Sequence, residues 1–143
     1  MAALSITAAQ VLPTASDPVT SGVAGEAVTQ GMAVYLSTSG TWLKAQGDGT
    51  AAEAGSEGYG IALNAAGAAG QPLQVALPGH RVTLGAGAAP AAGVTYYIGD
   101  TAGGLHPIAD IGSGDKVVGL CFGIGSNKVK IYGGAYDAGA VLA

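Results

Sequence analysis

The sequence predicts an all-β protein: a small β-sandwich or β-barrel built from two similar strand-hairpin-strand units, with an extended N-terminal arm. Short runs of β-branched, aromatic and aliphatic residues are bounded by Gly and Ser clusters, whereas no stretch of useful length has helical periodicity. The second half of the chain also repeats the pattern of the first. Two copies of a unit too small to bury a face alone would close together around one core.

The composition supports one folded domain and excludes several classes of partner. Of 143 residues, 26 are Gly and 29 are Ala, 49% are hydrophobic and 10% are charged, with a net charge of −4. This hydrophobic share is too high for a disordered chain. Five Lys and Arg residues are too few to line a nucleic-acid groove or hold an anionic membrane surface. No run of about 20 apolar residues could cross a membrane, and the first residues lack the basic start of a secretory signal.

Residues 1–22 are predicted to form an extended arm. Its apolar residues are Leu4, Ile6, Val11 and Leu12. Pro13 and Pro18 follow close together, and each disfavours helix at the residue before it. Apolar residues of this kind are unusual in a fully solvated tail, so we expect the arm to lie on a partner, and the alternative is a flexible terminus.

The first unit covers about residues 24–63. Its predicted strands are residues 27–29, 33–36, 41–45 and 59–63, followed by a strand at 73–77 in which apolar and polar positions alternate. Residues 34–36 and 42–44 are expected to pair as a hairpin across the Ser and Gly residues between them.

The second unit covers about residues 78–122 and matches the first piece by piece. Gly31–Leu36 corresponds to Gly93–Ile98, and the hairpin from Tyr35 to Trp42 corresponds to that from Tyr97 to Leu105. Residues 59–63 match 118–122, and the lead-in 24–29 resembles 78–83. A last strand is predicted at 129–132, so the β domain spans residues 23–132 and a Gly/Ala-rich tail follows at 133–143.

Residues that could carry catalysis are few and scattered, so no enzymatic activity, cofactor or metal is expected. His80 and His106 each lie beside Gly or Pro, which is typical of a surface turn, and no acidic residue follows at ligand spacing. Cys121 lies between Leu120 and Phe122, which favours a buried apolar residue over a nucleophile.

Three aromatic residues are candidates for a subunit or partner interface: Trp42, Tyr96 and Tyr136. Each has a large ring to bury and a polar atom that can bind water at a partly solvated interface. Most aromatic residues of the chain fall at strand positions that both units share, so core packing is the alternative. Aromatic side chains on a β surface also stack on sugars, which leaves glycan binding as a third interpretation.

Several segments resemble small structural proteins of tailed bacteriophages that are described as capsid decoration, or cement, proteins. The segments that carry the resemblance are residues 24–35, 42–45, 59–64, 70–73, 93–98, 103–110 and 118–120. The likeness extends over about residues 4–132 and rests on glycines, tyrosines and short strands, without a catalytic motif.

The resemblance implies a virion protein on the outer surface of the capsid, made in the host cytoplasm, self-associated as a homotrimer and bound to the major capsid protein. In this interpretation the arm is the capsid anchor: its residues Leu4, Ile6, Val11 and Leu12 would add a strand to the edge of a capsid sheet. The alternatives are a structural protein of the tail or of a head fibre, with glycan or receptor binding, and a virion enzyme. An enzyme would require Asp110, Asp115 or Asp137 to meet in space.

Overall fold

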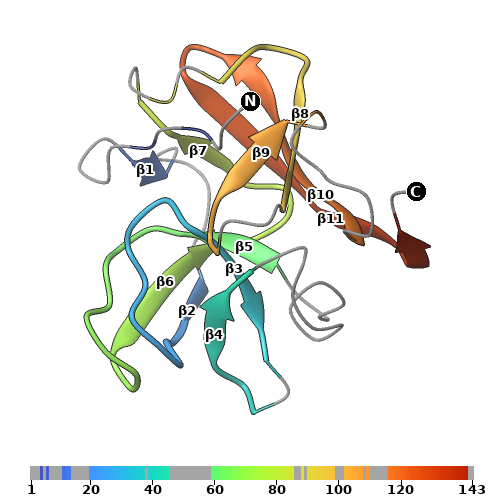
Figure 1. Cartoon of the computed structure of the whole chain (residues 1–143). Coiled ribbons are helices and arrows are strands. Elements are labelled where there is room, and N and C mark those ends of the chain that lie inside the picture. The colour runs from blue at the N-terminus through green and yellow to red at the C-terminus, as the bar shows by residue number, and fades with distance from the viewer. Residues whose placement is uncertain are drawn as a thin grey trace.

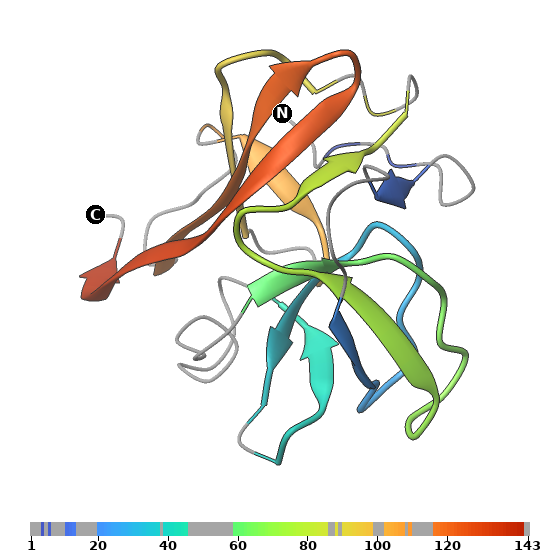
Figure 2. The same cartoon turned by 180° about the vertical axis from the view of Figure 1, so that it is seen from behind.

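The computed structural model describes residues 4, 6, 11–13, 20–37, 39–45, 59–85, 88, 90–98, 102–107, 109 and 116–141. At 12–13, 116–118 and 133–141 it describes the backbone alone. This part of the chain is built of β-strands in two antiparallel sheets and contains no α-helix, which confirms the all-β prediction. Sheet A lies above sheet B in Figure 1, and Figure 2 shows the same arrangement from behind.

Eleven strands form the two sheets in the described residues. Sheet B contains β2 (Thr20–Val23), β3 (Ala33–Leu36), β4 (Trp42–Lys44), β5 (Tyr59–Ala62) and β6 (Pro72–Ala76), in the order β2-β6-β5-β3-β4. Sheet A contains β1 (Leu12–Pro13), β7 (Arg81–Thr83), β8 (Thr95–Ile98), β9 (Leu105–Pro107), β10 (Lys116–Gly125) and β11 (Lys128–Val141), in the order β1-β7-β11-β10-β8-β9.

The two sheets are two copies of one topology. Numbered from its own first strand, each run of five consecutive strands has the spatial order 1-5-4-2-3, once as β2 to β6 and again as β7 to β11. We call residues 20–76 repeat 1 and residues 81–141 repeat 2. Each repeat includes the hairpin expected from the sequence: Leu36 pairs with Trp42 in β3–β4, and Ile98 pairs with Leu105 in β8–β9.

The hydrogen bonds before the second strand of each repeat establish which residues are equivalent. In repeat 1 the Met32 amide donates to the Thr29 carbonyl, and the Gly31 amide donates to the Ala62 carbonyl. In repeat 2 the Val94 amide donates to the Ala91 carbonyl, and the Gly93 amide donates to the Gly123 carbonyl. Gly31 and Gly93 have φ angles of 91° and 78°, values at which a side chain is strained, so both turns require glycine. Gly31–Leu36 is therefore equivalent to Gly93–Ile98, as the sequence predicts.

The repeats do not meet through equivalent faces. We call the face that carries Val34 and Leu36 in β3 the front of a repeat, and the face that carries Ala33 and Tyr35 its back. In β8 the equivalent front residues are Tyr96 and Ile98, and the back residues are Thr95 and Tyr97. Ala33 and Tyr35 belong to the same buried cluster as Tyr96 and Ile98, so the back of repeat 1 packs against the front of repeat 2.

Each repeat has its front covered by a different part of the chain. In repeat 1 the front residues Val34, Trp42, Leu73 and Val75 form a second cluster with Val28 and Ala66. The latter two lie in the links before β3 and before β6, where their backbone amides and carbonyls exchange two hydrogen bonds of 2.8 Å. Repeat 1 therefore covers its own front, whereas the front of repeat 2 is covered by repeat 1.

Several predicted boundaries differ from the structure. Residues 27–29 are not a strand but part of a link, with one isolated bridge at Val28, and the counterpart of β7 is β2 rather than residues 24–29. The first domain boundary falls inside β2. The segment predicted as a Gly/Ala-rich tail continues β11 up to Val141, because it pairs with β10 from Lys116 onward and so satisfies its backbone without bulky side chains. In both views the β10–β11 ribbon runs past the other strands (Figures 1 and 2).

Candidate interaction surfaces

The described part of the arm lies on its own chain. Leu12 and Pro13 pair with Val82 and Thr83 of β7, which makes β1 the edge strand of sheet A. The Leu4 amide donates a hydrogen bond of 2.8 Å to the Leu105 carbonyl, and the Gln30 side-chain amide donates one of 2.7 Å to the Val11 carbonyl. These bonds give the arm partners inside the molecule.

Apolar contacts hold the same residues in place. Val11 is 0% exposed, and Leu4 and Ile6 are half-buried against the cluster between the sheets. A β-carbon at Gly31 would lie 2.7 Å from Ile6 and 2.9 Å from Val11, so the missing side chain of this glycine makes the space for the arm. Three of the four proposed anchor residues thus have intramolecular contacts, and the side chain of the fourth, Leu12, lies outside the described residues.

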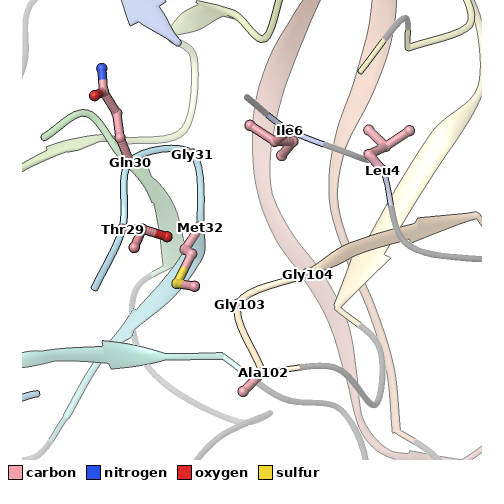
Figure 3. A pocket seen from close by; sticks show the side chains of 9 residues that line it. All are labelled: Leu4, Ile6, Thr29, Gln30, Gly31, Met32, Ala102, Gly103 and Gly104. Carbon is pink, nitrogen blue, oxygen red and sulfur yellow. The ribbon is translucent and has the colours of Figure 1, made fainter. Parts of the chain in front are cut away.

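A groove of about 190 Å³ lies beside the seated arm (Figure 3). Its lining comes from the arm, the turn before β3 and the turn between β8 and β9: Leu4, Ile6, Thr29, Gln30, Gly31, Met32, Ala102, Gly103 and Gly104. None of these side chains is charged, and the Gly103 carbonyl and amide are already bonded to Ala33 and Ala45 of repeat 1. The arm and both repeats meet at this groove. Its walls are mainly apolar, and Thr29 and Gln30 supply the two polar side chains.

Two of the three proposed interface aromatics are inside the molecule. Trp42 is 5% exposed in the front cluster of repeat 1, and Tyr96 is 4% exposed between the sheets. The Tyr96 hydroxyl accepts a hydrogen bond of 2.8 Å from the Ala91 amide, so its polar atom also has an internal partner. In this conformation both side chains are core residues. Tyr136 is placed in β11 opposite Val118, but its side chain lies outside the described residues.

The cysteine and the two histidines are held by burial or by hydrogen bonds within the chain. Cys121 is fully buried, and burial raises the pKa of its thiol to about 12, far from the range of a nucleophile. His106 is 3% exposed, so its expected place at the surface is wrong. The Nδ1 atom of His80 accepts a hydrogen bond of 2.9 Å from the Leu77 amide. Among the described side chains, no three His, Cys, Asp or Glu residues come together as a metal site.

The back of repeat 2 is a partly exposed aromatic surface. Phe122 and Tyr132 contact each other with ring centroids 5.9 Å apart, and Tyr132 is 39% exposed. A β-carbon at Gly119 would collide with the Tyr132 hydroxyl and lie 3.5 Å from the Tyr97 ring, so these two rings meet above a glycine. Partial burial raises the pKa of Tyr132 and the nearby Tyr97 adds to this, while a hydrogen bond with Thr95 lowers it. We call Thr95, Tyr97, Phe122 and Tyr132 the aromatic face.

Basic residues lie along one side of the aromatic face. Strand register places Arg81, Lys130, Phe122 and Thr95 directly opposite one another across β7, β11, β10 and β8. Lys128 is two residues from Lys130 on the same strand, so its side chain points to the same face. We call Arg81, Lys128 and Lys130 the basic edge. It contains three of the five Lys and Arg residues of the chain.

The predicted interface residue Tyr96 is the buried member of an adjacent pair of tyrosines. Tyr96 and Tyr97 are neighbours in a strand, so one must face the core and the other the opposite side, and the pattern does not say which. The signal that was available lies in β11, where Lys128, Lys130 and Tyr132 alternate with Val129 and Ile131. This period of two marks a strand with one polar face, and Tyr132 belongs to that face.

The comparisons add no family to this description. Neither the models of known protein families nor the curated proteins include a match to the chain. Within the described residues, no helix is long and apolar enough to cross a membrane.

Proposed function

We propose that this chain is a capsid decoration, or cement, protein of a tailed bacteriophage. It binds the outer surface of the head and stabilises the shell by bridging subunits of the major capsid protein, with the homotrimer as its working form. The proposal rests on the resemblance of the sequence to such proteins. One structural observation supports it further: the aromatic face is partly exposed on a duplicated β scaffold.

A duplicated scaffold of this kind suits attachment to a shell. The back of repeat 1 and the front of repeat 2 share one buried cluster, so the exposed back of repeat 2 is carried on a packed base. A protein that binds only the assembled shell stabilises it by mass action, and many copies on a closed shell add their weak single contacts. Each copy then needs one binding surface and no catalytic group.

The test uses heads of the encoding phage assembled without this chain. Purified chain is added, and the particles are imaged by electron cryo-microscopy and heated to measure the temperature at which the shell opens. We expect density in groups of three on the outer surface and a higher opening temperature. Absence of density from the head rejects the proposal, and density on the tail or on a fibre would favour the alternative of a tail or head-fibre protein.

A further inference from the structure

We propose that the back of sheet A, formed by the aromatic face and the basic edge, is the surface that docks onto an acidic protein surface, which under the proposed function is that of the major capsid protein. The inference deepens the proposed function and rests on it. It assigns the contact to the sheet face of repeat 2 rather than to the arm.

The duplication places equivalent faces of the two repeats in different environments. Tyr35 and Tyr97 occupy equivalent positions on the backs of the two repeats. Tyr35 is 6% exposed because its face packs against the other repeat, whereas Tyr97 is only half-buried. The back of repeat 1 therefore packs against repeat 2, whereas the equivalent back of repeat 2 is partly exposed.

Positive charges lie side by side on the back of repeat 2. Arg81 and Lys130 are direct cross-strand partners. Lys128 adds a third positive charge at the same edge in a chain whose net charge is −4. Carboxylates on a partner would complement these charges and steer the encounter. Lys44 in repeat 1 lies on the other face of the fold, 3.8 Å from a carboxylate oxygen of Glu26, and serves as the control below.

The aromatic centre of this surface favours an acidic protein over other polyanions. The middle of the surface is aromatic, with Phe122 against Tyr132, and the exposed Ile124 follows two residues after Phe122 in β10. Tyr, Phe and Arg are enriched where proteins meet, with charges at the rim. Nucleic acids and acidic polysaccharides need many phosphate or sulfate contacts, for which three cations at one edge are too few.

The arm is a weaker candidate for the same role. Val11 is 0% exposed, and the Leu4 amide is bonded to β9, so use of the arm as an added strand would first break these contacts. The back of sheet A needs no such release. Docking through a surface that is already formed avoids an ordering cost.

The experiment compares binding of four chains to heads that lack the protein: the unaltered chain, Lys130→Glu, Tyr132→Ala and Lys44→Glu. Binding is measured by co-sedimentation at low and high salt. Lys130 is exposed, so Lys130→Glu should keep the urea midpoint of the unaltered chain, and Tyr132→Ala, which removes a ring that is 39% exposed, should lower that midpoint only slightly. We expect each to weaken binding by roughly tenfold or more, with the salt dependence reduced in Lys130→Glu. Lys44→Glu, which makes the same charge change on repeat 1, should bind like the unaltered chain.

A labelling measurement avoids the variants altogether. Lysines of the unaltered chain are acetylated free and on the head, and modified positions are identified by mass spectrometry. Lys128 and Lys130 should become protected on the head while Lys44 stays reactive.

The outcomes separate the two proposals. If the unaltered chain does not bind heads, both fail. If it binds and the Lys130 and Tyr132 variants bind equally well, with Lys130 unprotected, only the docking surface fails. Retention on an acidic polysaccharide resin in place of head binding would assign the face to a glycan. A change of oligomeric state in Lys130→Glu, measured by sedimentation equilibrium, would assign it to contacts between copies. Either result overturns the inference.

Discussion

Repeat 1 and repeat 2 have the same strand order and the same glycine turn, yet they meet through opposite faces, the back of repeat 1 against the front of repeat 2. Repeat 1 is enclosed on both sides, by its own links on the front and by repeat 2 on the back. Repeat 2 has its front covered by repeat 1 and its back partly exposed. Duplication of a fold therefore does not duplicate its surface, because a face is buried only where some segment is available to cover it.

The links before the last strand of each repeat explain much of this difference. Residues 63–71 connect β5 to β6 and include Ala66, which helps to cover the front of repeat 1. The equivalent link between β10 and β11 is the two-residue turn Ser126–Asn127, with φ angles of 54° and 59°. Two positive φ angles characterise the tight type I′ hairpin. A turn of two residues is too short to fold back over the front of repeat 2.

The largest expected difference in stability is between variants of the two equivalent tyrosines, Tyr35 and Tyr97. Tyr35→Ala removes a ring from the cluster between the sheets and should lower the free energy of unfolding by about 3–5 kcal/mol. Tyr97→Ala removes a ring from a partly exposed face and should cost clearly less, about 1–2 kcal/mol. Urea unfolding monitored by Trp42 fluorescence measures both. Equal losses would mean that the backs of the two repeats are equally buried.

The next effect compares two glycines. A β-carbon at Gly60 would collide with Val75 and lie 2.5 Å from the Ala76 carbonyl oxygen, so Gly60→Ala must shift a strand and should cost about 1–3 kcal/mol. A β-carbon at Gly119 meets chiefly the exposed end of Tyr132, which can rotate away. Gly119→Ala should cost less than about 1 kcal/mol. Urea midpoints test the pair, and a greater loss for Gly119→Ala would contradict the exposed position of Tyr132.

A smaller effect concerns the hairpin of repeat 2. The double variant Ser126→Asn, Asn127→Gly supplies the pair that type I′ turns prefer and should stabilise the protein by about 0.5–1 kcal/mol. The thermal midpoint should rise accordingly, with head binding unchanged. A lower midpoint would argue against positive φ angles at both positions.

The last prediction uses Cys121 as a reporter of the contact between repeats. Its pKa is raised from 9.0 to about 12 by burial, so at pH 8 a thiol reagent should react with the native protein far more slowly than with the urea-unfolded chain. Between pH 9 and 12 the unfolded thiol ionises before the folded one, so this group lowers stability as the pH rises. Rapid native labelling at pH 8 would place Cys121 at an open interface.

Local patterns were sufficient for the strands and the duplication. Both hairpins and the equivalence of Gly31 and Gly93 follow from short stretches of sequence, because turn glycines and β-branched runs act on their immediate neighbours. The extension of β11 was missed for the same reason. Its Gly and Ala residues carry no strand signal of their own, and they are in a strand because β10 pairs with them.

The candidate surface could not be predicted in the same way. Alternation divides a strand into two faces but does not say which one meets another part of the chain, and a shift of one residue selects Tyr96 instead of Tyr97. The apolar arm posed a similar choice between a partner protein and its own core. In this structure Ile6 and Val11 fill the space left by Gly31, and that contact joins residues about 20 or more positions apart, which no local pattern reports.

The sequence by itself determined that this is an all-β chain made of two similar units, because strand runs, turn glycines and repeats are local and periodic. Only the tertiary structure decided that the back of repeat 1 meets the front of repeat 2, that the described apolar residues of the arm pack on the chain's own core, and that the aromatic face and the basic edge come together. These features depend on pairings between distant strands and on which segment is long enough to cover a face.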